Sequence, residues 1–337
     1  ISLGLVGSEM CIRDSKEVAA MHRSSGQGDL GRAWLSPRLG RNARLERIGA
    51  AFDWGAIEAL VAEVYSARTG RPSWPPVLML RALLLQQWYG LSDPGLEEAL
   101  SDRLSFRSFV GLGLDEGQPD HSTLSRFRKR LRELKLDERL FQEVERQLSA
   151  QGMLVRSGTL LDATLVEAAV RRPGAPAGSR SQVDPDAAWT RKGGTKHFGY
   201  KAHLGVDEGS GLIRRAVLTP AVINESLVAD ALICGDERAV YADRAYEHKD
   251  RRKRLKAAGV KDRIMHRSHK NQPRLPHWQA VRNRLISPIR SAVERVFGTL
   301  KRGYGYRHVR YRGLDANWLH LRLLCIAFNM RKATSAV

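Results

Sequence analysis

Apolar residues recur three and four positions apart from residue 45 to about residue 151, which is the period of an amphipathic helix. Pro75 and Pro76 predict the start of one long helix in this region, and Gly90 predicts its end. We therefore predict an all-helical domain over residues 45–151, preceded by a flexible N-terminal segment over residues 21–44.

The hydrophobic pattern changes at residue 158. Residues 158–168 read GTLLDATLVEA, and the apolar and β-branched residues on both sides of Asp162 predict a strand that is buried on both faces. Residues 197–206 and 212–219 then alternate between apolar and polar positions, with a short Gly-containing turn between them. This alternation predicts a β-hairpin.

The order of the elements indicates the fold class. A helical segment over residues 225–234 and a short strand over residues 239–243 follow the hairpin. The order strand, strand, strand, helix, strand, helix is typical of a mixed sheet flanked by helices, of the ribonuclease H kind. We expect this α/β domain over residues 152–332, with a mobile loop over residues 171–196 and a short tail over residues 333–337.

A further amphipathic segment lies near the end of the chain. Ser287 and Pro288 predict a helix start, with Ser at the N-cap and Pro at the first helical position. An apolar stripe follows, and a second stripe about 100° round the helix carries Arg290, Glu294 and Lys301. The polar stripe therefore borders the core.

The formal net charge of +20 is concentrated in one part of the chain. Residues 244–337 contain 24 Lys and Arg residues but only five Asp and Glu residues. A basic field of this kind indicates a nucleic-acid partner, because cations that neutralise phosphates release bound counterions. A ribosomal-type protein or a membrane-surface protein would have a similar charge.

Three cysteines lie far apart without metal-site spacing, which is typical of a protein of the reducing cytoplasm. No apolar run approaches the roughly 18 residues of a membrane-spanning helix. The first residues are weakly apolar and lack the basic start of a signal peptide. We expect residues 1–20 to be foreign or upstream sequence, and Met21 to be the natural start.

Three carboxylates stand out among these elements. Asp162 lies within an apolar strand, where an unpaired charge is costly, Asp243 ends a strand, and Glu294 borders the core on a helix. Mg²⁺ in phosphoryl-transfer sites is held by a few carboxylates together with water and phosphate oxygens. Two such ions can activate an attacking hydroxyl and stabilise the leaving oxygen. We therefore predict that these three residues hold two Mg²⁺ ions, for which Mn²⁺ is expected to substitute.

Each of these acidic residues also has a simpler interpretation. Asp162 would cap a turn if it stood at the end of its strand. Glu294 would form a routine helical ion pair with Arg290, four residues before it. Asp207 is a candidate fourth acid, but its place in the hairpin turn favours a role in forming that turn.

A strongly basic helix is predicted in the all-helical domain. Asp120 has the side chain of an N-cap, and Arg126, Arg128 and Lys129 follow it closely. This pattern is typical of a DNA-contacting helix in a helix-turn-helix-like arrangement. A solvated charged face would give the same pattern.

Other cations are candidates for DNA contact near the three carboxylates. Arg290 and Lys301 share a helix stripe with Glu294, and we expect them to bind phosphates beside the reacting bond. Lys196 and Lys201 flank the start of the predicted hairpin, where they either contact DNA or face solvent.

With these motifs in order, the chain resembles the DDE transposases of bacterial insertion sequences, of the IS-five-type family, over about residues 45–332. The family signature near the glutamate is Tyr, two residues, Arg, three residues, Glu, six residues and Lys, which Arg290, Glu294 and Lys301 match. Ser287 stands where the family has Tyr, so the handling of DNA ends is expected to differ. The other matching segments are residues 119–127, 162–164, 186–189, 199–203, 241–246 and 294–298.

The resemblance implies a function. It implies that a ribonuclease H-like core cuts and joins the terminal inverted repeats of an insertion sequence, with Asp162, Asp243 and Glu294 holding Mg²⁺. It also implies double-stranded DNA partners, namely the element ends and the target, a homodimer in the DNA complex, and no membrane. The helical domain would bind DNA and dimerise, and the protein would work on the nucleoid in the bacterial cytoplasm.

Other function classes make different demands on the sequence. A metal-dependent nuclease would use the same three carboxylates, and a non-catalytic DNA-binding regulator would need only the positive charge. A tyrosine recombinase needs a His-x-x-Arg motif, and residues 308–311 have the wrong spacing. A serine hydrolase would need a G-x-S-x-G motif, which the sequence lacks.

Overall fold

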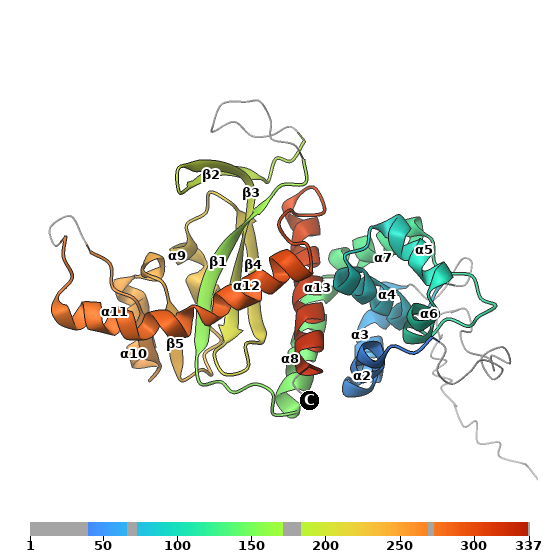
Figure 1. The fold of residues 1–337 in the computed structure, drawn as a ribbon, viewed down its shortest axis with the longest axis horizontal. Helices are drawn as coiled ribbons and strands as arrows, with labels where there is room; N and C mark the ends of the chain where they lie inside the picture. The colour runs from blue at the N-terminus through green and yellow to red at the C-terminus, as the bar shows by residue number, and fades with distance from the viewer. Residues whose placement is uncertain (1–39, 66–72, 171–182, 269–272, 336–337) are drawn as a thin grey trace, which may run out of the picture.

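The computed structural model describes residues 40–65, 73–170, 183–268 and 273–335 (Figure 1). The expectations for residues 1–20 and for most of residues 21–44 lie outside the described residues. The same holds for residues 171–182, the first part of the predicted mobile loop.

The predicted helical pattern before residue 151 is confirmed. Each helix buries apolar side chains in a shared core, which these short helices need because isolated helices of this length are marginal in water. The helices are α2 (Ala43–Ala51), α3 (Trp54–Val61), the 3-10 turn η1 (Ala62–Val64), α4 (Pro76–Tyr89), α5 (Asp93–Asp102), α6 (Leu104–Val110), α7 (His121–Glu133) and α8 (Leu136–Ala150).

Local sequence signals set several of these helix ends. Pro76 occupies the first turn of α4, and Gly90 ends that helix in the left-handed region with φ 64°. Asp120 caps α7, and its carboxylate accepts a 2.7 Å hydrogen bond from the N–H of Thr123. The expected ends of α4 and the expected start of α7 are therefore confirmed.

A six-stranded mixed sheet follows the helices, as the element order predicts. β1 is antiparallel to β3 and parallel to β5, and β5 is parallel to β6. The order is β2-β3-β1-β5-β6, with β4 paired to β3, which is the ribonuclease H-like arrangement expected from the sequence. The strands are β1 (Thr159–Glu167), β2 (Ala188–Lys192), β3 (Thr195–Asp207), β4 (Ile213–Pro220), β5 (Ala239–Ala242) and β6 (Lys261–Ile264).

Two strands were not predicted. β2 lies inside the expected mobile loop over residues 171–196, so that prediction is wrong for residues 188–196. Trp189 of β2 packs against Phe198 of β3 with ring centroids 5.2 Å apart, which anchors the strand. β6 carries three charged residues, and only its Ile264 is buried, so it lacks the hydrophobic pattern of a strand.

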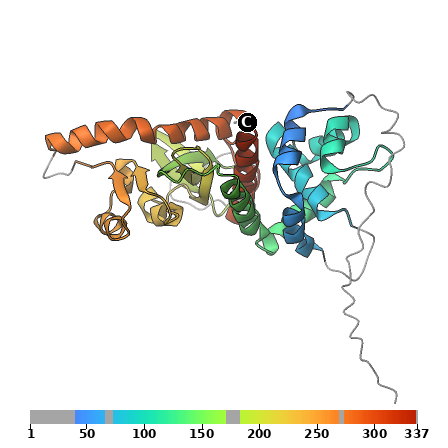
Figure 2. The same ribbon diagram turned by 90° about the horizontal axis from the view of Figure 1, so that it is seen from below.

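Helices cover both faces of the sheet, as Figure 2 shows. One face carries a smaller core cluster that includes Leu161, Ala242 and Tyr246. The other face packs Leu160 into the main core, together with residues of α12 and α13. The flanking elements are α9 (Glu225–Val228), η2 (Ala229–Leu232), η3 (Arg244–Tyr246), α10 (Lys249–Ala257), α11 (His277–Arg290), α12 (Ala292–Gly303) and α13 (Leu314–Ala333).

The helix start predicted at Ser287 and Pro288 is wrong. α11 begins at His277 and continues through Pro288, and the helical assignment is interrupted only at Ser291. Ser291 keeps helical angles of −59° and −15°, so α11 and α12 form one long rod that crosses β1 (Figure 1). Pro288 lacks the N–H that would reach residue 284, a loss that a helix tolerates when its other turns are supported.

α13 joins the helical region to the sheet. The indole N–H of Trp88 in α4 donates a 2.8 Å hydrogen bond to the carbonyl oxygen of Ala327. Two residues later, the side chain of Asn329 accepts from the N–H of Ile213 in β4 and donates to its carbonyl oxygen. α13 therefore contacts both parts of the protein.

Candidate functional site

Asp162 lies on β1, and Asp243 directly follows the neighbouring parallel strand β5. Leu161 of β1 is in register with Ala242, the last residue of β5, so an aspartate comes next in the chain after each of them. Neighbouring strands are about 4.8 Å apart, which places the two aspartates side by side where β5 ends. The register thus brings together two residues that are far apart in the sequence.

Glu294 reaches the same edge from α12, through Arg290. The guanidinium of Arg290 lies 3.2 Å from Oδ2 of Asp162 and 3.1 Å from Oε1 of Glu294. The routine helical pair between Arg290 and Glu294 is present, but the same guanidinium also binds an acid on the sheet. Glu294 is otherwise open to solvent, with 61% of its side chain exposed.

Burial controls the charge of Asp162. Its side chain is only 19% exposed, and burial raises its pKa to about 6. The N–H of Ala163 and the cation of Arg290 oppose this rise in pKa, whereas the charges of Glu225 and Asp243 add to it. An ionised Asp162 therefore needs nearby positive charge, as expected for a carboxylate in a low-polarity setting.

The chemistry of these donors suits a hard divalent cation, because carboxylate oxygens are the ligands that Mg²⁺ prefers. The three carboxylates are not gathered at mutual ligand distance, since within the described ranges only Cys234, Asp236 and Glu237 have ligand atoms all within 4.8 Å. Like charges repel, and here the guanidinium of Arg290 supplies the positive charge between two of them. The residues therefore fit the ion in type.

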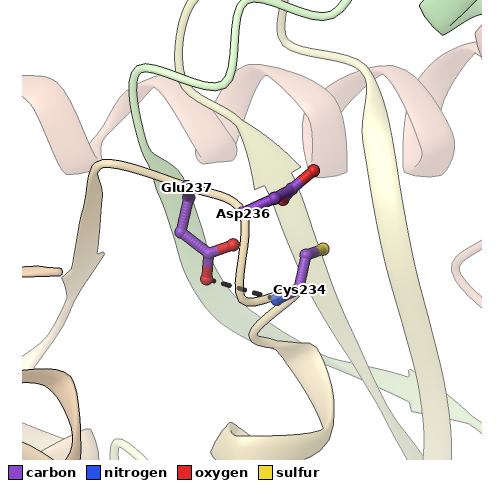
Figure 3. Close-up of side chains that lie close together, drawn as sticks. All are labelled: Cys234, Asp236 and Glu237. Carbon is purple, nitrogen blue, oxygen red and sulfur yellow. Dashed lines mark hydrogen bonds between the residues drawn. The ribbon is translucent and has the colours of Figure 1, made fainter. Parts of the chain in front are cut away.

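The cluster of Cys234, Asp236 and Glu237 is a stabilised turn (Figure 3). The carboxylate of Glu237 accepts hydrogen bonds from the N–H groups of Cys234 and Gly235. Asp236 binds the guanidinium of Arg214 through both oxygens, at 2.7 and 2.9 Å. Burial raises the pKa of the Cys234 thiol to about 12. Burial thus keeps the thiol protonated, and a protonated thiol does not favour a metal site.

Asp207 is a turn former, as its position in the sequence favours. Its carboxylate accepts hydrogen bonds from the N–H groups of Arg156 and Ser210, at 2.8 and 2.9 Å. It pairs with Thr159, three residues before Asp162 on β1. Its carboxylate is engaged by the hairpin turn and by the segment before β1, so Asp207 belongs to the hairpin.

The predicted DNA contacts in α7 divide into two kinds. Arg126 and Lys129 are exposed, as a DNA contact requires. Arg128 is buried, forms an ion pair with Asp93, and lies over the ring of Tyr311. Its prediction as a DNA contact is corrected, because its guanidinium stabilises the helical core.

The predicted contacts near the sheet also differ in exposure. Lys196 is exposed on the β2–β3 hairpin. Lys301 is partly buried, and this burial lowers its pKa. The positive charges of Lys192 and Arg307 lower it further, so three cations lie near one another at this point of α12. Lys201 points inward, since only 12% of its side chain is exposed and it binds Glu225, so its prediction as an open DNA contact is corrected.

Two residues near the carboxylates were not predicted as site residues. Glu225 follows Asn224, which caps the start of α9. This local signal does not indicate that a distant strand lies beside Glu225. Tyr246 lies in the matching segment 241–246, in which only Asp243 was predicted to be a site residue. In both cases the proximity to the carboxylates arises only in the folded structure.

The described residues include no helix with both the length and the apolar character needed to span a bilayer.

Two family models match the sequence. Residues 34–130 match a family described as "Transposase domain (DUF772)", and residues 154–330 match a family described as "Transposase DDE domain". The second match covers more than half of the chain. A solved structure titled "Crystal structure of the Mos1 Strand Transfer Complex" is 12% identical, covering 84% of this chain and 84% of that chain. Its TM-score of 0.19 is too low to support a structural argument.

Proposed function

Because the chain belongs to the transposase DDE domain family, a family of phosphoryl-transfer enzymes, we propose that it cuts and joins the ends of an insertion sequence. The finer proposal is a member of the IS-five-type family that acts on terminal inverted repeats. The bridge that Arg290 forms between Asp162 and Glu294 carries this proposal, since it unites a strand acid and a helix acid at one edge of the sheet.

Each acidic residue has a role in this proposal. Asp162, Asp243 and Glu294 hold the divalent ions, for which Mg²⁺ is the proposed choice and Mn²⁺ a substitute. When bound, two such ions activate the attacking hydroxyl and stabilise the leaving oxygen. The rigid pairing of β1 with β5 holds the two aspartates in place and limits the reorganisation needed on binding.

Arg290 is proposed to exchange its two carboxylate partners for phosphate oxygens of DNA. In the protein alone its guanidinium neutralises Asp162 and Glu294. With divalent ions bound at those carboxylates, its planar fork would be free to bind phosphate oxygens of DNA in the same bidentate way. Lys301 lies on the same helix, and with Lys192 and Arg307 it extends the cationic surface toward the β2–β3 hairpin.

The helical region supplies a second DNA contact in this proposal. The exposed Arg126 and Lys129 of α7 bind phosphates, and residues 45–151 also form the dimer contact in the DNA complex. Residues 152–332 form the catalytic domain. The proposed working place is the bacterial nucleoid.

An end-cleavage assay tests the proposal. Purified protein is incubated with its flanking DNA ends and Mg²⁺, and wild type is compared with Asp243→Asn. We expect the variant to lose cleavage by at least about 100-fold, because positioning residues around a metal already cost 10- to 100-fold when changed. DNA binding, measured by fluorescence anisotropy in EDTA, is expected to survive.

Controls separate the alternatives. Asp250→Asn removes an exposed carboxylate of the same domain and should leave cleavage unchanged. Cleavage without joining to target DNA would indicate a metal-dependent nuclease. Equal cleavage by wild type and Asp243→Asn would overturn the assignment of the acidic residues, and DNA binding without any cleavage would favour a regulator.

A further inference from the structure

A fourth carboxylate lies at the edge of the sheet where Asp162 and Asp243 meet. Glu225 begins α9, on the face of the sheet opposite α12. The guanidinium of Arg251 donates hydrogen bonds to the carbonyl oxygens of Ser226, the next residue of α9, and of Tyr246, three residues after Asp243. Because β5 stops at Ala242, no strand of that pair covers β1 beyond this point. Groups from both faces of the sheet can therefore meet there.

Lys201 holds Glu225 from the neighbouring strand. The ammonium nitrogen of Lys201 lies 3.4 Å from Oε1 of Glu225 and donates a 2.9 Å hydrogen bond to the carbonyl oxygen of Ile223. Lys201 is in register with Leu165 of β1, three residues beyond Asp162. The lysine thus fixes the start of α9 against the strand that carries Asp162.

A buried hydroxyl beside these acids has no hydrogen-bond partner. Tyr246 is 0% exposed, and its hydroxyl oxygen makes no hydrogen bond in the described structure. The charges that act on it are those of Glu225, Asp162, Asp243 and Arg290, in that order. Leaving a buried hydroxyl without a hydrogen-bond partner is unfavourable, so a partner is expected in the working state of the protein. A cation-bound water among these acids would be such a partner.

We infer that Glu225 belongs to the divalent-ion site as a fourth carboxylate, held in place by Lys201. This inference rests on the proposed function, and it adds a ligand group that the three-acid motif does not contain. Glu225 approaches the site from the α9 face, whereas Arg290 and Glu294 approach it from the α12 face. Acids from both sides of the sheet therefore contribute to the proposed ion site.

Mn²⁺ binding to the full chain, without DNA, tests the inference. Free Mn²⁺ is measured by electron paramagnetic resonance during titration of wild type, Glu225→Gln, Glu225→Asp and Asp162→Asn. We expect Glu225→Gln to weaken Mn²⁺ binding by roughly 10- to 100-fold, as changes around metal sites do. Glu225→Asp keeps the charge but shortens the side chain, so it should remain several-fold weaker than wild type. Asp250→Asn should bind like wild type.

The outcomes separate the inference from the function on which it rests. If Asp162→Asn loses Mn²⁺ while Glu225→Gln binds like wild type, the inference is overturned and the proposed ion site stands. If neither variant changes Mn²⁺ binding, the proposed ion site itself is wrong. If Glu225→Asp restores full affinity, the effect is one of charge alone and the inference is again overturned. Repeating the titration at high salt weakens such through-space effects.

Folding is checked on the same samples. Thermal unfolding in EDTA shows whether each variant is folded before the titration begins. Should Glu225→Gln fail to fold, Glu225→Asp decides the question alone, because the aspartate keeps an anion beside Lys201. A folded Glu225→Asp with wild-type affinity would then overturn the inference, and a weaker affinity would support it.

Discussion

Arg290 and Asp162 are 128 residues apart in the chain, and they meet through a guanidinium and a carboxylate 3.2 Å apart. The same guanidinium holds Glu294, so one cation joins the helix acid to the strand acid. A planar fork can contact two carboxylates at once, whereas a single ammonium group cannot match that geometry. The bridge depends on the shape of arginine as well as on its charge.

The first prediction concerns that shape. Arg290→Lys keeps the charge but loses the fork, so we expect DNA-end cleavage to fall by roughly one to two orders of magnitude. The exposed Arg284 lies on the same helix, and Arg284→Lys is the matched control. Cleavage assays under saturating DNA measure both. Wild-type cleavage by Arg290→Lys would show that the bridge has no role in the reaction.

The second prediction concerns pH and Asp162. Its pKa is raised to about 6 in the folded protein, so folding binds a proton between the ordinary pKa of an aspartate and pH 6. Stability therefore falls as the pH rises through this window, and the full cost is present above it. Asp162→Asn should stabilise the EDTA-treated protein at pH 7.5 by up to about 3 kcal/mol, and the gain should disappear near pH 4.

Urea unfolding at the two pH values measures this difference. Asp250→Asn serves as the control, because Asp250 is exposed and has only long ion pairs at 3.9 and 4.0 Å. A destabilised Asp162→Asn at pH 7.5 would contradict the argument. It would show that the bond to Arg290 outweighs the burial of the charge.

The third prediction separates two neighbours on α7. Arg128 is buried against Asp93, so Arg128→Ala should cost about 3–5 kcal/mol of stability, as the loss of one partner of a buried pair does. Lys129 is 67% exposed, so Lys129→Ala should leave stability unchanged. It should instead weaken DNA binding and reduce the salt dependence of the affinity by about one unit of slope. Thermal unfolding and anisotropy at several salt concentrations distinguish the two residues.

The fourth prediction tests how α4 is attached to α13. Trp88→Phe removes the indole N–H that binds the carbonyl oxygen of Ala327, at an expected cost of about 1 kcal/mol. Trp318→Phe is the matched control, because the indole nitrogen of Trp318 has no hydrogen-bond partner in the described structure. Equal unfolding temperatures for the two variants would show that the bond does not stabilise the junction.

Local signals predicted the parts of the fold that depend on neighbouring residues. Gly90 and Asp120 mark helix ends because their conformation and hydrogen bonds involve residues within a few positions. The strand around Asp162 and the short strand before Asp243 were likewise visible from apolar runs. Pro288 misled the prediction, because a proline suits a helix start and here lies inside a helix that begins at His277.

The remaining features depend on residues that are distant in the sequence. Nothing near Arg128 indicates that Asp93, 35 residues earlier, buries its charge. Nothing near Glu225 indicates that Lys201 and Asp162 lie beside it, because that depends on the register of β1 with β3. The exposed basic residues of α7 and the inward-facing Lys201 cannot be told apart from the sequence around them. Only the packing of the folded chain distinguishes them.

The dual attachment of α13 has a consequence for synthesis of the protein. The ribosome makes this helix after every other described helix and strand, yet both α4 and β4 form hydrogen bonds with it. Neither the catalytic sheet nor the helical region can therefore pack fully until α13 has been synthesised. A nascent chain would be joined into one working enzyme only after α13 has been made, and a premature stop codon before residue 314 would leave both parts without their common support.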